Sequence, residues 1–321
     1  MLLIATDEAG YGPKLGPLVI VATAWHVPDD HTAGALDDDF APLRDPIAFQ
    51  GITVKVDDSK AVFQPGKGLD TLHAVTSASM AWCRTDTVTD NFSNLINKVC
   101  PEDQRDIDRT PWLQPDATLK LMTADEVDPI VNHWNTARCQ LLGVQARVIT
   151  AEQFNRACAN GSNKADLLSR TTLNLARTTW EKHAGSASSE PSNQTMIYCD
   201  RHGGRRYYAA VLQHTFPSAW IRIEAESPKQ SVYQFDIEGQ QITAHFTVKG
   251  DSFTPVALAS MHAKYMRERM MDSFNRYFDN LSGGAVKPTA GYPVDADRFL
   301  KEIDTFLKQN NVDRESLVRC R

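Results

Sequence analysis

Residues 4–13 read IATDEAGYGP, an apolar run that ends in two adjacent acids, Asp7 and Glu8, followed by a tyrosine between two glycines. A second apolar run, LVIVATAWHV at 18–27, is rich in Val and follows a Gly/Pro stretch. This pattern predicts two strands of a sheet joined by a shaped loop. The first strand then carries carboxylates at the edge of a sheet, where they must be solvated, paired or bound to metal.

The rest of the chain alternates between strand-like and helix-like patterns. Strands are predicted at 143–149, 195–200, 219–226, 232–237 and 241–248, and helices at 68–82, 162–183, 254–278 and 295–310. TAEQ at 150–153 fits a capping box. Strands mixed with helices on this scale predict an α/β fold with a mixed central sheet flanked by helices. We expect residues 1–321 to form one domain.

One part of the chain breaks this pattern. Residues 84–122 are polar, contain three prolines and lack a sustained period. We therefore predict that 84–140 is an insertion of irregular and short helical structure. The sequence does not indicate its role.

Composition limits the possible classes of protein. The 321 residues are 42% hydrophobic and carry a formal net charge of −6, so nucleic-acid binding would need a local basic surface. The six cysteines form no Cys-x-x-Cys pair, which favours reduced thiols and a cytoplasmic location. No apolar run approaches the ~18 residues of a membrane span. We expect a soluble monomer with no membrane partner.

Four acids lie at or just after predicted strand ends: Asp7, Glu8, Asp200 and Asp251. If these strands are neighbours with their ends on one side, the carboxylates converge at a crevice where α/β sheets bind ligands. Carboxylates so close repel one another and raise each other's pKa values unless cations neutralise them. Mg²⁺ or Mn²⁺ is the natural partner, and a two-ion site usually serves phosphoryl chemistry.

A plain structural role is the alternative for each acid, because an Asp at a strand end is often a turn former or a helix N-cap. Glycines adjoin all of these strand ends and would let backbone or ligand come close: Gly10, Gly12, Gly203, Gly204 and Gly250.

Five stretches in matching order resemble the prokaryotic type 2 ribonucleases H (RNase HII), which cut the RNA strand of RNA–DNA hybrids. They are TDEAGYGPKLGPLVIVATAW at 6–25, DDSKAV at 57–62, IYCDRHGG at 197–204, VKGDSFTPVALASMHAKYMRER at 248–269 and AGYPVDADRFLKEI at 290–303. The family's motifs there are Asp-Glu-x-Gly-Arg-Gly, Asp-Ser-Lys, Ile-Asp-Gly, a Lys-Gly/Ala-Asp turn with its helix, and Gly-Tyr-Pro-Thr. The resemblance spans most of the chain, excluding 28–50 and 84–140.

The resemblance implies an RNase H-like fold and a divalent-metal endonuclease. It assigns Asp7, Glu8, Asp200 and Asp251 as catalytic metal ligands for Mg²⁺ or Mn²⁺, in agreement with their spacing. The substrate would be an RNA–DNA hybrid or a ribonucleotide embedded in duplex DNA, and the products a 3′-hydroxyl and a 5′-phosphate. Residues 285–321 would form a helical segment on or beside the substrate groove.

The resemblance also implies a set of substrate-binding residues: Gly10, Tyr11, Gly12, Ser59, Lys60, Ser260, Lys264, Arg267 and Tyr292. Main-chain groups at the glycines would sense a 2′-hydroxyl. Tyr11 stands where the family has arginine, which puts preference for a DNA–RNA junction in doubt. Several of these residues have a structural alternative: a tight turn for the glycines, a solvated surface lysine for Lys60, a solvated helix face paired with Glu268 for Lys264 and Arg267, and a partly buried loop aromatic for Tyr292.

Two histidines near these motifs receive different interpretations. His202 lies just after Asp200 and is a candidate for proton transfer. His262 takes a position that is usually apolar in the resembled family and is interpreted as a packing histidine. Two rival functions stay open. One is a non-catalytic nucleic-acid-binding relative, and the other is a phosphotransferase or ATPase on the same kind of fold, for which no Walker-type Lys-Ser/Thr is present.

Overall fold

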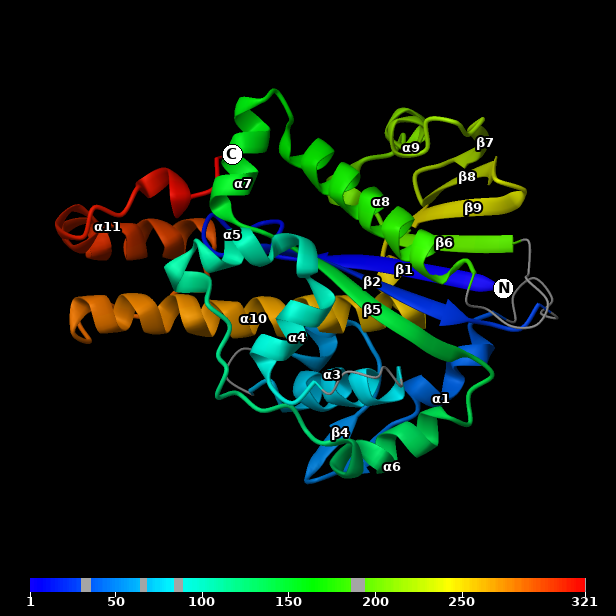
Figure 1. The fold of residues 1–321 in the computed structure, drawn as a ribbon, viewed down its shortest axis with the longest axis horizontal. Coiled ribbons are helices and arrows are strands. Elements are labelled where there is room, and N and C mark those ends of the chain that lie inside the picture. Colours follow the sequence, from blue (N-terminus) through cyan, green and yellow to red (C-terminus); the bar gives the residue numbers. More distant parts are fainter. Residues whose placement is uncertain (30–35, 64–67, 84–88, 186–193, 321) are drawn as a thin grey trace.

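A central sheet organises the computed structural model, which describes residues 1–29, 36–63, 68–83, 89–185 and 194–320 (Figure 1). Within these ranges the sheet has seven strands in the order β5-β2-β1-β6-β9-β8-β7. Their bounds are β1 Leu2–Ala9, β2 Leu18–His26, β5 Gln140–Ile149, β6 Gln194–Asp200, β7 Arg222–Glu226, β8 Gln230–Ile237 and β9 Gln240–Thr247. The prediction of an α/β fold with a mixed central sheet is confirmed.

Strand direction decides which ends meet. β1 runs antiparallel to β2 but parallel to β6, and β6 runs parallel to β9. The carboxyl ends of β1, β6 and β9 therefore lie at one edge of the sheet. β8 and β9, the strands predicted at 232–237 and 241–248, pair antiparallel as a hairpin.

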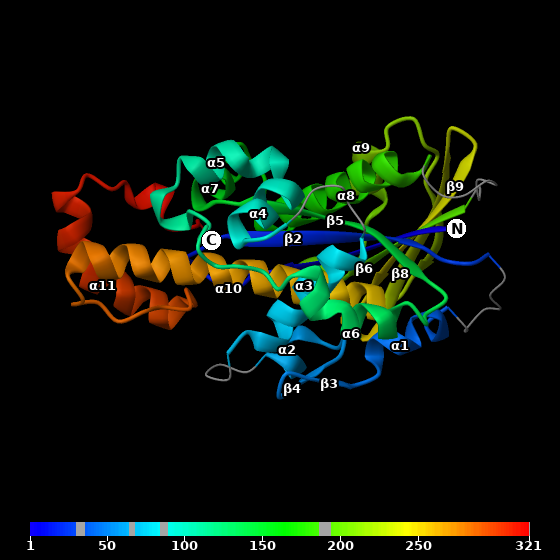
Figure 2. The same cartoon turned by 60° about the horizontal axis from the view of Figure 1, so that its bottom comes forward.

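Helices cover both faces of the sheet. α10 (Thr254–Ser282) and α3 (Asp70–Trp82) lie on one face, and α8 (Lys164–His183) and α9 (Ala209–Thr215) lie on the other (Figures 1 and 2). Side chains of β1 alternate accordingly: Leu3 and Ala5 join the core under α10, and Leu2 and Ile4 join the core under α8.

α10 follows its sequence pattern closely. It begins with Pro255 in its first turn and ends at Gly283, whose φ of +64° suits a residue without a Cβ. Most of its Met and aromatic side chains are buried against the sheet and the neighbouring helices: Met261, Tyr265, Met266, Met270, Met271, Phe274 and Phe278.

Segment 84–140 packs on the same face as α10, except that residues 84–88 lie outside the described residues. It forms α4 (Phe92–Val99), η2 (Pro101–Asp103), α5 (Gln104–Asp108), η3 (Pro111–Leu113) and α6 (Ala124–Trp134). Phe92, Trp112 and Trp134 are buried in one core with the α10 side chains. Short helices and irregular turns were predicted here, and the structure has both.

Several short elements complete the chain. They are η1 (Asp38–Phe40), α1 (Ala41–Arg44), β3 (Ile47–Phe49), β4 (Ile52–Val54), α2 (Ser59–Val62), α7 (Ala151–Ala159), η4 (His202–Gly204), η5 (Gly250–Ser252), α11 (Pro293–Gln309) and η6 (Arg314–Ser316). The capping box of α7 is confirmed, because Thr150 and Gln153 bond reciprocally at 2.8 and 3.3 Å. None of the described helices has the length and apolar character to span a membrane.

Candidate active site

The predicted acids come together at one edge of the sheet. Asp7 and Glu8 occupy the last residues of β1 rather than the loop after it, because β1 continues to Ala9. The parallel register pairs Thr6 with Cys199, so Asp7 and Asp200 are the next residues on neighbouring strands. Asp251 lies in η5, just after β9.

A glycine brings η5 onto β6. The Gly250 N–H donates a hydrogen bond of 2.8 Å to Asp200 Oδ1. A Cβ at Gly250 would lie 2.9 Å from the Asp200 Cα, closer than real side-chain carbons approach backbone. The predicted close approach of backbone at this glycine is therefore present, and it places Asp251 beside Asp200.

The carboxylates influence one another's charge. Burial raises the pKa of Asp7 to about 7, and the negative charges of Asp200 and Asp251 add to this rise, while hydrogen bonding from Ser260 opposes it. Burial, followed by the charges of Asp7 and Asp200, holds the pKa of Glu8 well above its usual range. Burial also raises the pKa of Asp251. The sheet edge thus gathers negative charge that lacks full compensation from the protein.

The chemistry of these side chains fits a hard divalent cation, because all four donors are carboxylate oxygens with unfavourable mutual charge. The four carboxylates do not form a metal-ligand cluster in this structure: within the described ranges, no three His, Cys, Asp or Glu side chains are grouped closely enough to hold a metal ion. The predicted assignment of these acids as metal ligands therefore stays a prediction.

The Asp-Ser-Lys stretch lies against this acidic centre. The Ser59 and Ser260 hydroxyl oxygens are 2.9 Å apart, and both residues are buried. Lys60 Nζ is 4.0 Å from Asp251 Oδ2, and the Lys60 side chain is 84% exposed. Its positive charge opposes the rise in the pKa of both Glu8 and Asp251.

The glycine–tyrosine turn forms the rim of the site. Gly10 has a φ of +91°, and a Cβ there would lie 2.7 Å from Arg267 Nε. Gly12 faces Tyr292, since a Cβ on Gly12 would lie 3.6 Å from the Tyr292 ring. The turn is fixed to the Gly-Tyr-Pro segment because Lys14 N–H donates to the Gly291 carbonyl at 2.8 Å.

Tyr11 lies on the β6 side of this turn. Its hydroxyl packs on Gly203, and Lys164 Nζ lies 4.2 Å from the centre of its ring. Burial and the charge of Glu8 raise the pKa of Tyr11, and the charge of Arg205 opposes the rise. The tyrosine is therefore held between the acidic centre and nearby cations.

Arg267 and Lys264, which the resemblance implies as substrate-binding residues, do not form an exposed basic face. Arg267 is only 2% exposed, and its guanidinium donates to Glu268 at 2.9 Å and to the Ala290 carbonyl at 3.0 Å. Lys264 Nζ donates to Glu268 at 2.7 Å and lies over the Phe63 ring. The structural alternative was a solvated face paired with Glu268. The pairing is observed, but Arg267 is buried rather than solvated.

Both histidines are interior residues. His202 is buried, its Nδ1 lies 3.2 Å from Ser169 Oγ, and burial together with the charge of Arg205 lowers its pKa to about 3. The proton-transfer interpretation of His202 is therefore wrong, because the ring turns into the core under α8. His262 is buried in α10 with its pKa lowered to about 4 by burial, which confirms a packing histidine.

Sequence reasoning missed two contributors. Asp58 caps α2 by accepting a hydrogen bond of 2.9 Å from the Lys60 N–H, and its charge raises the pKa of Asp251. Its place directly before Ser59 was an available N-cap signal. Arg319 donates a hydrogen bond of 2.7 Å to the Gly10 carbonyl, and no local pattern marks it.

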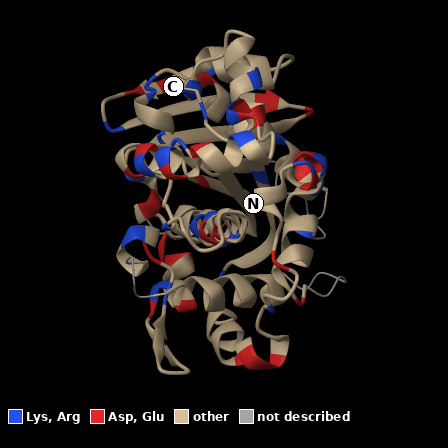
Figure 3. Cartoon of the chain, turned by 90° about the vertical axis from the view of Figure 1, so that its left-hand side faces the viewer, with Lys and Arg blue, Asp and Glu red and all other residues tan. Residues whose placement is uncertain are grey.

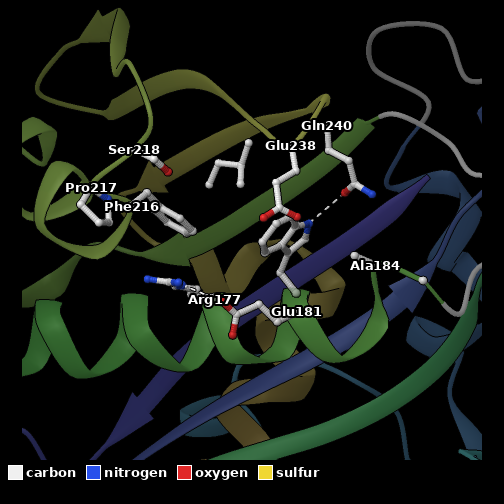
Figure 4. Close-up of a pocket in the computed structure, with 11 residues that line it drawn as sticks. Arg177, Glu181, Ala184, Phe216, Pro217, Ser218, Glu238 and Gln240 are labelled. Atoms are coloured by element: carbon white, nitrogen blue, oxygen red, sulfur yellow. Dashed lines mark hydrogen bonds and ion pairs between the residues drawn. The ribbon is translucent and has the colours of Figure 1, made fainter.

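A cavity of about 370 Å³ lies away from the acids, between α8, α9 and the β8–β9 hairpin (Figure 4). Trp180 and Gln240 are joined across it by a 3.0 Å hydrogen bond, and Arg177 and Phe216 also line it. No predicted site residue lines this cavity. A second cavity, of about 320 Å³, adjoins the acidic centre at Cys199 and Gly250.

Comparison with known proteins gives structural likeness only. No protein-family model matches the sequence, and no curated protein matches it. Ribonuclease H2 from Pyrococcus horikoshii OT3 is 12% identical with a TM-score of 0.40, and the match covers 99% of this chain and 92% of that one. A chain of the PCNA:RNase HII complex from Archaeoglobus fulgidus is 13% identical with a TM-score of 0.41, covering 100% and 95%. Bst-RNase HIII in complex with Mn²⁺ is 14% identical with a TM-score of 0.40, covering 99% and 66%. Likeness at this level does not assign the chain to a family.

Proposed function

We propose that this protein is a divalent-metal-dependent endonuclease that hydrolyses the RNA strand of RNA–DNA hybrids, or cuts at ribonucleotides embedded in duplex DNA. The observation that carries the proposal is the meeting of the ends of β1, β6 and β9, which brings Asp7, Glu8, Asp200 and, in η5 just after β9, Asp251 to one edge of the sheet, with the pKa of Asp7 raised to about 7. The order of the five sequence stretches that resemble RNase HII supports the same function.

Mg²⁺ or Mn²⁺ would neutralise the carboxylates and supply the Lewis acidity that phosphodiester hydrolysis requires. Asp7, Glu8, Asp200 and Asp251 would hold it. Among these, Asp200 is oriented by the Gly250 N–H and Asp7 by Ser260. Lys60 is an exposed cation beside Asp251 and would contact a backbone phosphate.

The rim of the site offers groups for the sugar-phosphate backbone. Gly10–Gly12 would present main-chain atoms to the minor groove of a hybrid, where the 2′-hydroxyl distinguishes RNA from DNA. Tyr292, 53% exposed and next to Gly12, would pack on a sugar. Basic and acidic residues are interspersed over the molecule (Figure 3), so binding would depend on local cations such as Lys60 and Lys249, both exposed.

Cleavage assays test the proposal. The protein is incubated with an end-labelled RNA–DNA hybrid and with a DNA duplex that carries one ribonucleotide, each with Mg²⁺ or Mn²⁺. We expect metal-dependent cleavage of at least the hybrid by the wild type and by the surface control Asp236→Asn, and a loss of at least ~100-fold in Asp7→Asn. If all three proteins leave both substrates uncut, the nuclease function is rejected. Binding of the duplex without cleavage would favour the non-catalytic nucleic-acid-binding relative.

A further inference from the structure

The last described segment of the chain lies against the glycine–tyrosine turn. Leu15 and Val318 form an antiparallel bridge, and the Arg319 N–H donates to the Lys14 carbonyl at 3.0 Å. The Arg319 side chain continues inward, where Nη1 donates to the Gly10 carbonyl at 2.7 Å. Figure 1 shows this end of the chain beside α7, across the molecule from the N-terminus.

The same segment is fixed on its other side to α7. Asn155 Nδ2 donates to the carbonyls of Glu315 and Val318 at 2.7 and 2.8 Å, and Asn155 Oδ1 accepts from the Cys320 N–H at 2.6 Å. The Arg319 guanidinium lies 5.5 Å from the centre of the Phe154 ring. One α7 side chain thus holds three main-chain groups around Arg319.

Arg319 is in an unfavourable place for a purely structural cation. It is 3% exposed, and its Nε and Nη2 have no hydrogen-bond partner within the described residues. Burial, followed by the neighbouring charge of Arg267, lowers its pKa to about 9. A buried cation beside a second one costs stability. The hydrogen bond from Arg319 to the Gly10 carbonyl therefore points to a function other than stabilising the fold.

We propose that Arg319 is a positioning residue that sets the orientation of the Gly10–Tyr11 peptide in the substrate-contacting turn; this rests on the nuclease function proposed above. The carbonyl and N–H of a trans peptide point in opposite directions. Holding the Gly10 carbonyl against Arg319 therefore turns the Tyr11 N–H away from the core, toward the side on which substrate would lie.

The role concerns binding and recognition rather than the acidic centre. Arg319 contacts the turn through Gly10 and touches none of the four carboxylates by hydrogen bond or ion pair among the described residues. Gly10 has a φ of +91°, a conformation easily exchanged for others by a residue without a Cβ. Contacts from other parts of the chain are therefore needed to hold the turn in one orientation, and the hydrogen bond from Arg319 is one of these contacts.

The test compares Arg319→Ala and Arg319→Lys with Arg314→Ala, which removes an exposed cation of the same segment. Asn155→Ala releases the segment without altering Arg319 and serves if Arg319→Ala folds poorly. Measurements are KM and kcat on both substrates, melting temperature, and hydrogen exchange of peptides that cover 10–12.

For Arg319→Ala we expect KM to rise roughly tenfold with kcat within about twofold, and exchange at 10–12 to accelerate roughly tenfold. Arg319→Lys should recover part of the KM, because an ammonium can still donate to the carbonyl. Arg314→Ala should match wild type. The positioning role is overturned if Arg319→Ala leaves both KM and hydrogen exchange at 10–12 unchanged. It is equally overturned if the variant lowers only the melting temperature. If the wild type neither binds nor cuts hybrid, the nuclease proposal fails, and the exchange data still decide whether Arg319 orders the turn.

Discussion

The hydroxyl oxygens of Ser59 and Ser260 lie 2.9 Å apart although the residues are separated by 201 positions in the chain. Ser260 also hydrogen-bonds to the Asp7 carboxyl group, and in the Ser59–Ser260 bond either hydroxyl can be the donor. This buried chain of polar groups joins α2, α10 and the end of β1. It orients Asp7 and ties the exposed Lys60 to the acidic centre.

Replacement of Ser260 should therefore weaken metal binding. In Ser260→Ala the Asp7 carboxylate loses a hydrogen bond worth about 1–2 kcal/mol, so its ionised form is less favoured. We expect the Kd for Mn²⁺ to rise roughly tenfold, measured by calorimetric titration at pH 7. Ser59→Ala keeps the contact with Asp7 and should have a smaller effect. Equal Kd values for Ser260→Ala and wild type would contradict the proposed orientation of Asp7.

Removal of one acid should stabilise the metal-free protein. Folding raises the pKa of Asp7 from its ordinary value to about 7, so the ionised side chain destabilises the fold progressively as the pH rises toward 8. In Asp7→Asn the free energy of unfolding without metal should increase by roughly 1–3 kcal/mol at pH 8. The measurement is urea unfolding with EDTA.

The same variant should lose its response to metal. Mn²⁺ should raise the melting temperature of wild type and leave that of Asp7→Asn nearly unchanged, while Asp236→Asn behaves as wild type. A metal-free Asp7→Asn that is less stable than wild type at pH 8 would show that Asp7 has an ordinary structural partner.

His262 should make the fold sensitive to acid. Its folded-state pKa is lowered to about 4, so the unfolded chain binds more protons between pH 6.5 and 4. The stability from a neutral His262 is fully present above pH 6.5 and is lost as the pH falls toward 4. Both ring nitrogens lack a hydrogen-bond partner within the described residues, so His262→Leu removes an unsatisfied group.

We expect His262→Leu to be at least as stable as wild type at pH 8. At pH 5 the difference in free energy of unfolding between the variant and wild type should be larger by about 1–2 kcal/mol in favour of the variant. Urea unfolding at the two pH values provides the measurement. An identical pH dependence in both proteins would mean that His262 is solvated or paired in the folded state.

Gly250 should tolerate no side chain. In Gly250→Ala the new Cβ meets the Asp200 backbone at 2.9 Å, so η5 must shift and carry Asp251 away. We expect a loss of roughly 1–3 kcal/mol in stability and at least ~10-fold lower cleavage. Gly185→Ala is the matched control, since a Cβ there meets nothing within 4 Å. Wild-type cleavage by Gly250→Ala would separate Asp251 from the site.

Local pattern predicted the elements that carry the acids. Short apolar runs that end in an acid and are followed by glycines predicted β1 and β6, and helical spacing predicted α10. The helix Phe92–Val99 could also have been predicted from its helical spacing. Its buried residues Phe92, Leu95, Ile96 and Val99 follow helical spacing, but the surrounding prolines obscured them.

Contacts across long sequence separations were not predictable. Arg267 and Lys264 share a helix face by spacing, yet Arg267 is buried because the turn at Gly10 packs against it. The sequence of α10 does not show where that turn lies. The Arg319–Gly10 bond spans 309 positions. His202 follows an acid in sequence but turns to the opposite face of the sheet, into the core under α8.

Crystals grown with Mn²⁺ test the central claim most directly, because manganese can be located by its anomalous scattering. The account predicts one or two anomalous peaks bounded by carboxylate oxygens of Asp7, Glu8, Asp200 and Asp251, and their loss in Asp7→Asn. Peaks only at other surface positions, with each of these carboxylates engaged by a protein donor, would contradict it.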